Sequence, residues 1–193
     1  MKEVAIEKKV IAKMVAKAFG GQPRVIRYWD EKDENCVDIL SCIDQPQKGI
    51  TSYSTIGVSD YTNIIDSKNV DIRVELVGIC SNTIEFFPNI LSTAAFCIIN
   101  SKWSGFPDAI FPNVIGMYDK SITMQHLLFT DPFIWDDTLE TLKFADKRVT
   151  WLLLVPISDA ELQYAETEGV DKLQKRLADN QVDISDINRV SVV

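Results

Sequence analysis

The stretch Val149-Thr150-Trp151-Leu152-Leu153-Leu154-Val155-Pro156-Ile157 decides the fold. It has the length of a β-strand, and it would place apolar side chains on both of its faces. A strand of this kind lies in the middle of a sheet. The stretch is followed at once by Ser158-Asp159-Ala160-Glu161, which has the form of a capping box opening a helix. We therefore predict a central strand that ends where a helix begins.

Upstream of this stretch, a run of strands is predicted at residues 23–29, 36–43, 50–58 and 70–80. In the last of them Asp71, Arg73 and Glu75 alternate with apolar residues, which is typical of a strand with one buried face and one wet face. The connections are too short for helical crossovers, so these strands are expected to be antiparallel. Two further short strands are expected at residues 114–118 and 124–130.

Helices are predicted on either side of these strands. Apolar residues recur at three- and four-residue steps near the start of the chain, which predicts an amphipathic helix over residues 3–19 that ends at Gly20-Gly21. A mostly buried helix is expected over residues 83–102, and the last helices run to about residue 180. Together these elements predict an α+β protein, a single domain over residues 1–193 with a mixed, mainly antiparallel sheet flanked by helices.

Composition narrows the classes of partner. The 193 residues include 46% hydrophobic and 25% charged residues, as in ordinary globular proteins. No apolar run approaches the ~20 residues of a membrane span, and the first residues lack the apolar core of a secretion signal, so a cytoplasmic protein is expected. The net charge is −8, and residues 1–20 carry five Lys against two Glu, so the remainder is more acidic still. An acidic body disfavours nucleic acid and anionic membranes and favours basic partners, although acidity for solubility alone would look the same.

The residues show no catalytic constellation. Phosphate-binding glycine loops and a G-x-S-x-G elbow are absent from the sequence. Cys36, Cys42, Cys80 and Cys97 form no C-x-x-C pair and are interpreted as free thiols. His126 stands alone at alternate spacing on a strand, as a surface or boundary histidine with its hydrogen bonds satisfied would. We predict no enzyme activity, no cofactor and no metal site.

Candidate partner-binding residues are acidic or aromatic. They lie in a charged turn, in a loop with two aromatic residues, and around a tryptophan near the last strands: Asp30, Glu31, Asp33 and Glu34; Trp103 and Phe106; Trp135, Asp136 and Asp137. Aromatic residues in loops are often important at interfaces. The turn would equally serve as a solvated connection, and Trp103 would equally close the end of a core.

A series of segments resembles the suppressor-of-fused (SUFU) domain family, in its bacterial branch. The segments that carry the resemblance are, in order, Gly49–Ser59, Arg73–Gly78, Ala95–Trp103, Phe111-Pro112, Leu127-Leu128-Phe129, Asp131-Pro132-Phe133, Trp151–Glu161 and Arg189–Val193. Together they extend over roughly residues 20–193.

This resemblance implies an antitoxin, or immunity protein, that binds the toxic C-terminal domain of a cognate bacterial polymorphic toxin. That toxin domain is expected to be a nuclease, whose basic surface would suit an acidic inhibitor. The family offers no catalytic residues to transfer. The alternative implied by the animal relative is a protein-interaction module that binds a peptide strand at a sheet edge. An exposed edge would also permit a homo-oligomer.

Overall fold

The computed structural model describes residues 5–65, 68–70, 72–135 and 137–193. The helices are α1 (Ile6–Phe19), α2 (Phe87–Ile99), α3 (Asp159–Glu168) and α4 (Val170–Asp179), with short 3-10 turns η1 (Val58–Asp60) and η2 (Phe133–Trp135). The strands are β1 (Pro23–Trp29), β2 (Cys36–Ile43), β3 (Ile50–Ile56), β4 (Asn63–Ile65), β5 (Lys68–Val70), β6 (Ile72–Ser81), β7 (Ile110–Phe111), β8 (Met124–Thr130), β9 (Leu142–Lys143) and β10 (Arg148–Ser158).

One large sheet organises the molecule, in the order β1-β2-β3-β6-β10-β8-β7, with β9 paired to β10. β10 runs parallel to β6 and antiparallel to β8, so it lies inside the sheet, as its two apolar faces predicted. The pairs β1–β2, β2–β3 and β3–β6 are antiparallel, which confirms the expected run of strands. The mixed, mainly antiparallel α+β fold is therefore confirmed.

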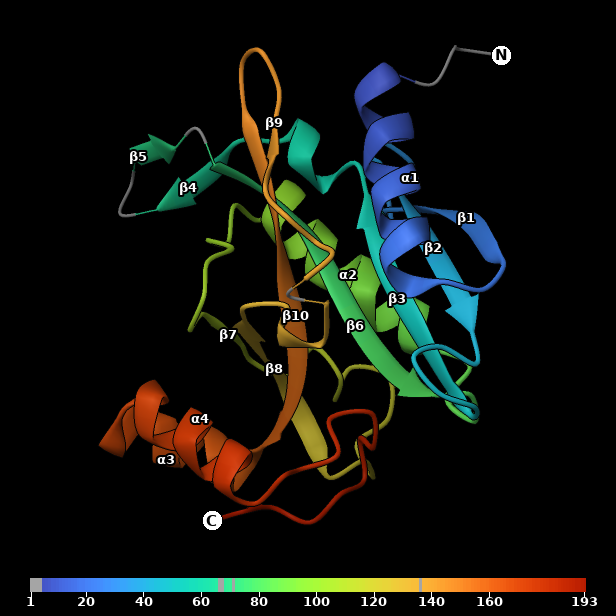
Figure 1. Cartoon of the computed structure of the whole chain (residues 1–193). Helices are drawn as coiled ribbons and strands as arrows, with labels where there is room; N and C mark the ends of the chain where they lie inside the picture. Colours follow the sequence, from blue (N-terminus) through green and yellow to red (C-terminus); the bar gives the residue numbers. More distant parts are fainter. Residues whose placement is uncertain (1–4, 66–67, 71, 136) are drawn as a thin grey trace.

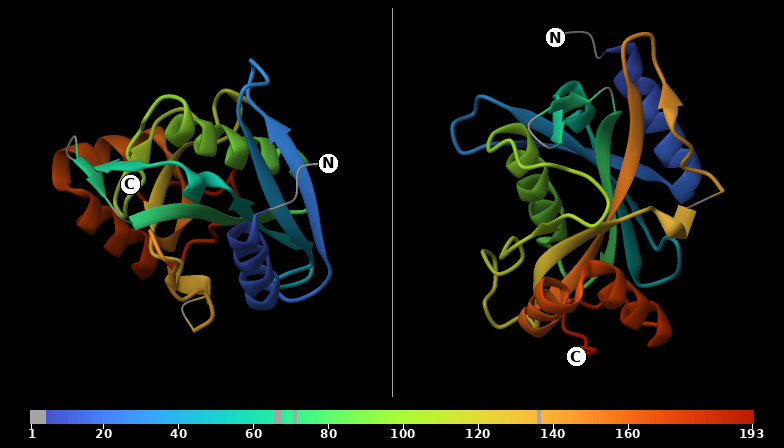
Figure 2. Two further views of the ribbon diagram at one scale, coloured as in Figure 1. Left: turned by 90° about the horizontal axis from the view of Figure 1, so that it is seen from above. Right: turned by 90° about the vertical axis from the view of Figure 1, so that its left-hand side faces the viewer.

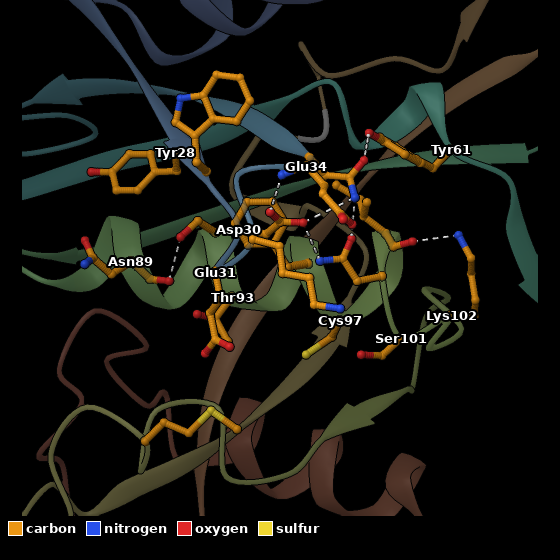
Figure 3. Close-up of a pocket in the computed structure, with 18 of the residues that line it drawn as sticks. Tyr28, Asp30, Glu31, Glu34, Tyr61, Asn89, Thr93, Cys97, Ser101 and Lys102 are labelled. Atoms are coloured by element: carbon orange, nitrogen blue, oxygen red, sulfur yellow. Dashed lines mark hydrogen bonds between the residues drawn. The ribbon is translucent and has the colours of Figure 1, made fainter.

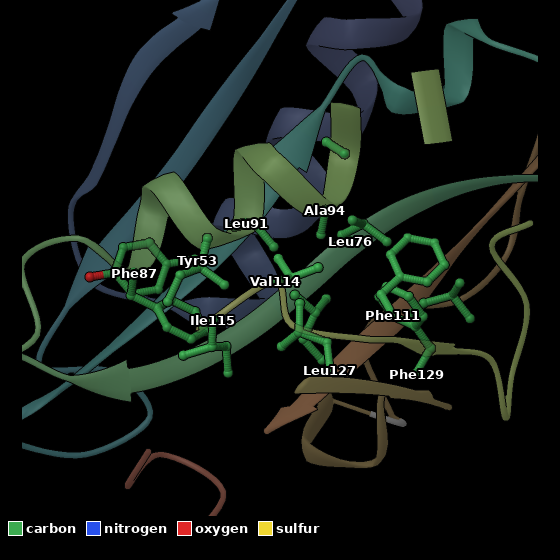
Figure 4. Packing of buried hydrophobic residues seen from close by; sticks show 14 of the residues in the cluster. Tyr53, Leu76, Phe87, Leu91, Ala94, Phe111, Val114, Ile115, Leu127 and Phe129 are labelled. Atoms are coloured by element: carbon green, nitrogen blue, oxygen red, sulfur yellow. The ribbon is translucent and has the colours of Figure 1, made fainter. Parts of the chain in front are cut away.

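Both faces of this sheet are covered (Figures 1 and 2). On one face, α2 packs over a core that includes Phe87, Leu91 and Phe129 (Figure 4). On the other face, α1 and the C-terminal helices pack over a second core. Along β10, Leu152 and Leu154 point into the first core while Trp151 and Leu153 point into the second. Each fully buried aliphatic side chain typically contributes about 1.5–3 kcal/mol, so the two cores hold the layers together.

The helices form largely where the pattern placed them. α1 ends at Phe19, and Gly20 follows with a φ of 75°, as expected of a glycine after a helix. The predicted residues 3 and 4 of this helix lie outside the described part of the chain. The capping box of α3 is present: Glu161 N donates to Ser158 Oγ at 3.1 Å, and Ser158 N donates to Glu161 Oε2 at 3.0 Å. Among the described helices, none is long and apolar enough to cross a membrane.

The strand expected at residues 114–118 is wrong. This segment forms turns instead, and the short strand β7 precedes it. Asn113 has a φ of 59°, which reverses the chain direction, and the backbone N–H groups of Ile115 and Gly116 both donate to Gln125 O. The apolar side chains of Val114 and Ile115 are buried in the core beneath α2, and they do not belong to a strand.

The solvent-exposed face expected for residues 71, 73 and 75 is wrong at Glu75. Glu75 has no exposed surface, because β6 lies between β3 and β10 and the sheet is covered on both sides. Its carboxylate accepts hydrogen bonds from both side-chain and backbone donors of residues 55–59. Arg73 is half-buried, and Asp71 lies outside the described residues. Glu75, one of the three alternating charged residues, therefore belongs to an internal polar site.

Candidate functional site

A cleft of about 840 Å³ opens between the β1–β2 turn, α2 and the loop that follows β7. The turn supplies Asp30, Glu31 and Glu34 to the cleft, and α2 supplies a row of residues that includes Thr93 and Cys97. Figure 3 shows Asp30 and Glu31 above α2, with Tyr28 to one side and Tyr61 to the other. Three of the four predicted turn carboxylates therefore lie at one concave site.

Hydrogen bonds fix the acidic turn against the end of α2. Asp30 Oδ1 accepts from Glu34 N at 2.9 Å, and Asp30 Oδ2 accepts from Asn100 Nδ2 at 3.0 Å and Asn35 Nδ2 at 3.2 Å. Asn35 Nδ2 also donates to Asn100 Oδ1 at 3.0 Å, and Tyr61 OH donates to Asn35 Oδ1 at 3.0 Å. The turn is thus held in place by residues that are far away in the sequence.

This network also affects the charge of Asp30. Desolvation acts to raise the pKa of its carboxyl, but hydrogen bonds from Glu34, Asn35 and Asn100 outweigh it, so that the pKa is lowered. Asp30 is half-buried, whereas Glu31 and Glu34 are exposed. Asp30 therefore anchors the turn as a carboxylate, and the side chains of Glu31 and Glu34 are exposed at the cleft.

The opposite wall of the cleft is aromatic and well ordered. Tyr118 stacks on Phe86 with 5.9 Å between ring centroids. Its hydroxyl donates to Asn89 O at 3.0 Å and lies 2.6 Å from Thr93 Oγ1, so the ring is held to the first turns of α2. Met117 beside it is 62% exposed, and Trp29 on the turn side is 52% exposed. The cleft thus exposes an apolar side chain on each of these two sides.

The two lysines that line this cleft, Lys32 and Lys102, differ in whether their ammonium groups are already engaged within the protein. Lys102 has a φ of 58°, and its Nζ donates to Ile99 O at 2.6 Å at the end of α2. The same ammonium lies 5.9 Å from the centre of the Tyr61 ring. Lys102 therefore satisfies a backbone carbonyl at the C-terminal end of α2, where a cation is favoured. Lys32 is exposed in the turn, so the mouth of the cleft carries more carboxylates than free ammonium groups.

The other predicted residues lie elsewhere. Asp33 belongs to the same turn and is exposed, but it does not line the cleft. Trp103 packs edge-on against Phe111 at 4.8 Å and is 36% exposed, so it partly closes the end of a core, and Phe106 is 37% exposed in the same loop. Both remain accessible at their outer edges.

Trp135 is 5% exposed and packs on Phe19 of α1 with 4.6 Å between ring centroids. Its core is the one on the sheet face opposite α2, so its ring does not reach the cleft. Asp137 is exposed, and Asp136 lies outside the described residues. The structure therefore brings the acidic turn to a cleft but does not bring the tryptophan group to it.

Several cleft residues were not found by sequence reasoning. Asn35, Asn100, Tyr61 and Tyr118 carry no local motif, and they meet only through the packing of α2 against the turn. The two consecutive polar residues after the helix, Asn100-Ser101, were the one available signal, because polar residues commonly end a helix.

Two side chains of reactive types, His126 and Cys97, are held in settings that limit their reactivity. Asn113 N donates to His126 Nδ1 at 2.8 Å, and His126 Nε2 lies 2.8 Å from Asp159 Oδ1, so both ring nitrogens are used. This histidine is satisfied, as expected, but it is buried. Burial raises the pKa of the Cys97 thiol to about 11. In the described part of the chain, no three His, Cys, Asp or Glu side chains gather as metal ligands would.

Comparison with known proteins assigns this chain to one family. The family model of suppressor of fused protein (SUFU) matches residues 33–190. The chain belongs to the SUFU family. It is 49% identical over 190 residues to a protein of Bacillus subtilis (strain 168) named Immunity protein YqcF, across 98% of this chain and 99% of that one.

Solved structures show the same fold at low sequence identity. A SUFU homolog from Neisseria gonorrhoeae FA 1090 superposes with a TM-score of 0.77 at 16% identity, over 96% of each chain. A chain of the Sufu–Fu complex superposes with a TM-score of 0.63 at 14% identity, over 95% of this chain and 91% of that one. Drosophila Suppressor of Fused superposes with a TM-score of 0.60 at 14% identity, over 94% of this chain and 50% of that one.

Proposed function

We propose that this protein is an antitoxin that binds and neutralises the toxic C-terminal domain of a cognate bacterial polymorphic toxin. The observation that carries the proposal is the cleft beside the acidic turn, which presents Glu31 and Glu34 next to the exposed Trp29 and Met117. Hot spots at protein interfaces are enriched in aromatic residues, and the contacts around them exclude water. Similarity to an immunity protein over nearly the full chain supports the same role.

The toxin domain is proposed to be a nuclease. A nuclease must hold phosphates and therefore carries a basic surface. The net charge of −8 of this chain would attract such a surface and accelerate the encounter. Asp30 holds the turn in shape before binding, so that little ordering entropy is lost when the partner arrives.

A second candidate mode is the addition of a peptide strand at the β1 edge. In the described sheet β1 pairs with β2 on one side only. Val25 is 51% exposed and Ile26 is 39% exposed, so this edge presents apolar side chains beside unpaired backbone groups. A peptide strand would pair with the free edge, whereas a toxin surface would seat on the cleft.

Co-expression with the toxin domain encoded beside the gene of this chain tests the proposal. We expect a stable complex and rescue of growth. The double substitution Glu31→Lys with Glu34→Lys should weaken the complex at least tenfold, because it reverses two charges at the cleft. The matched control, Glu140→Lys with Glu166→Lys, makes the same change in net charge at exposed positions away from the cleft and should bind nearly as wild type.

The outcomes of these binding measurements distinguish binding at the cleft from strand addition at the β1 edge. A complex that survives charge reversal at residues 31 and 34 but is lost with Val25→Asp would identify strand addition at β1. The absence of both a complex and growth rescue for the wild-type chain would refute the antitoxin role.

A further inference from the structure

We propose that a second groove, distinct from the cleft, binds a protein segment that carries an apolar side chain between basic ones. This groove, called here the α4 groove, has a volume of about 750 Å³ and lies between α4, the end of β8 and the loop after it. It shares no lining residue with the cleft beside the acidic turn. The proposed antitoxin function does not use the α4 groove.

The floor of the α4 groove is apolar. Val155 of β10, Leu177 of α4 and Ile184 of the C-terminal tail line it, and Phe133 stands at its edge with 54% of its surface exposed. The small side chain of Ala178 lines it as well and leaves room above the helix. An aliphatic side chain that enters the groove would lose contact with water, and this burial of apolar surface favours binding.

The rim of the groove is acidic. Asp108, Asp131 and Asp171 line it, and none of the described residues that line it is Lys, Arg or His. Asp108 Oδ1 accepts from Gln174 Nε2 at 2.6 Å, which links the rim to α4 without neutralising it. None of the ion pairs found among the described residues involves these three carboxylates. The groove therefore carries uncompensated negative charge above an apolar floor.

The sequence of α4 places its cations away from the groove. Asp171, Gln174 and Ala178 lie at helical spacing on α4 and line the groove, and Gln181 lines it just after the helix ends. The three cations of the helix are engaged elsewhere: Lys172 pairs with Glu168 at 2.7 Å, Lys175 with Asp179 at 3.0 Å, and the Arg176 guanidinium lies 4.9 Å from the centre of the Tyr164 ring.

This separation of charge selects the occupant. An acidic segment would be repelled by the rim, and a neutral polar segment would leave the floor wet. A segment with an aliphatic side chain flanked by Lys or Arg satisfies both parts of the site, because the cations reach the rim while the aliphatic group covers the floor.

Peptide titration of the isotopically labelled full-length chain, followed by NMR, tests the inference without any toxin. The probe is the capped tripeptide Arg-Leu-Arg, and the comparison peptides are Glu-Leu-Glu, which reverses the charge, and Arg-Gly-Arg, which removes the aliphatic group. We expect Arg-Leu-Arg to shift the amide signals of Thr130, Asp171 and Gln174. Both comparison peptides should bind more weakly.

Substitutions within the groove complete the test. Asp131→Asn with Asp171→Asn should weaken Arg-Leu-Arg by roughly threefold to twentyfold, as expected for the loss of two surface ion pairs. The control, Asp137→Asn with Asp146→Asn, removes the same charge at exposed positions outside the groove and should leave the affinity unchanged. Equal binding of Glu-Leu-Glu, shifts confined to other surfaces, or an equal loss in the control would overturn the inference.

Discussion

The hydroxyl of Thr55 on β3 donates a hydrogen bond of 2.6 Å to Glu75 Oε2 on β6, within the sheet and out of contact with solvent. The other oxygen of the carboxylate, Oε1, accepts from Gly57 N at 2.8 Å, Ser59 N at 3.1 Å and Ser59 Oγ at 2.6 Å. One buried side chain thus fixes the segment that leaves β3. Gly57 in that segment has a φ of 118°, a conformation that glycine adopts at little cost.

Replacement of Glu75 by Gln should therefore destabilise the fold strongly. The amide NH₂ would face donors that now meet a carboxylate oxygen, and unsatisfied buried groups cost about 1–3 kcal/mol each. We expect the free energy of unfolding to fall by about 2–4 kcal/mol, measured by urea denaturation. Glu85→Gln, at an exposed position, is the control and should change little. A Glu75→Gln protein as stable as wild type would contradict this role.

Loss of Arg189 should release the C-terminal tail. Arg189 Nη1 lies 2.7 Å from Glu161 Oε1 and Nη2 lies 2.8 Å from Glu161 Oε2, and Glu161 has no exposed surface. Arg189→Ala would leave this carboxylate buried without its cation, at a cost of about 3–5 kcal/mol. Arg189→Lys keeps the charge but cannot form the bidentate hydrogen bonds, so an intermediate loss of stability is expected.

Thermal denaturation and limited proteolysis of the tail would rank the Arg189 variants. Arg24→Ala, at an exposed arginine on β1, is the control. The same melting temperature for Arg189→Ala and Arg24→Ala would show that the buried pair contributes nothing.

The acidic turn should keep its shape in mild acid. The pKa of Asp30 is lowered from its ordinary value of 3.8, because hydrogen bonds outweigh desolvation. A lowered pKa in the folded state means that this contribution to stability is complete above pH 3.8 and is lost as the pH falls through the lower, folded-state pKa. NMR titration of the side-chain carboxyl should find its midpoint below 3.8, and Asn100→Ala should move the midpoint upward. An unchanged midpoint in Asn100→Ala would exclude this hydrogen bond as a cause.

Substitution of the buried Trp135 should lower stability, whereas substitution of the exposed Trp29 should weaken binding. Trp135→Ala removes a ring from the core and should lower the free energy of unfolding by about 3–5 kcal/mol. Trp29→Ala acts at a residue that is 52% exposed and should change stability by less than about 1 kcal/mol. If the cleft binds the toxin domain, Trp29→Ala should weaken that complex tenfold or more, whereas the milder Trp135→Phe should leave it intact. Denaturation and binding measurements on the same variants would check both expectations.

Local patterns were enough for most of the secondary structure. The bounds of β1, β2 and β8 coincide with the predicted segments 23–29, 36–43 and 124–130. The capping box predicted at Ser158 and Glu161 forms. The prediction of a strand at residues 114–118 was wrong because a segment buried beneath a helix has the same apolar composition as a strand.

The candidate site was predictable only in part. The charged turn was visible as a cluster of acids, and three of its residues line the cleft. Its second wall, with Met117 and Tyr118, lies more than eighty residues away in a loop that carries no motif. The binding function of the turn and of the other predicted site residues therefore stays a prediction, which binding measurements on the variants above would test.

The sequence by itself determined what depends on neighbours along the chain: an amphipathic helix that stops at Gly20, a strand apolar on both faces, and a helix that begins at Ser158. Only the tertiary structure decided what depends on neighbours in space. It buried the charge of Glu75, enclosed the ring of Trp135 against α1 and set the acidic turn over α2. The reason is physical, because a polar or aromatic side chain is exposed or buried according to which distant segments supply its hydrogen bonds and contacts, and residue spacing carries no record of them.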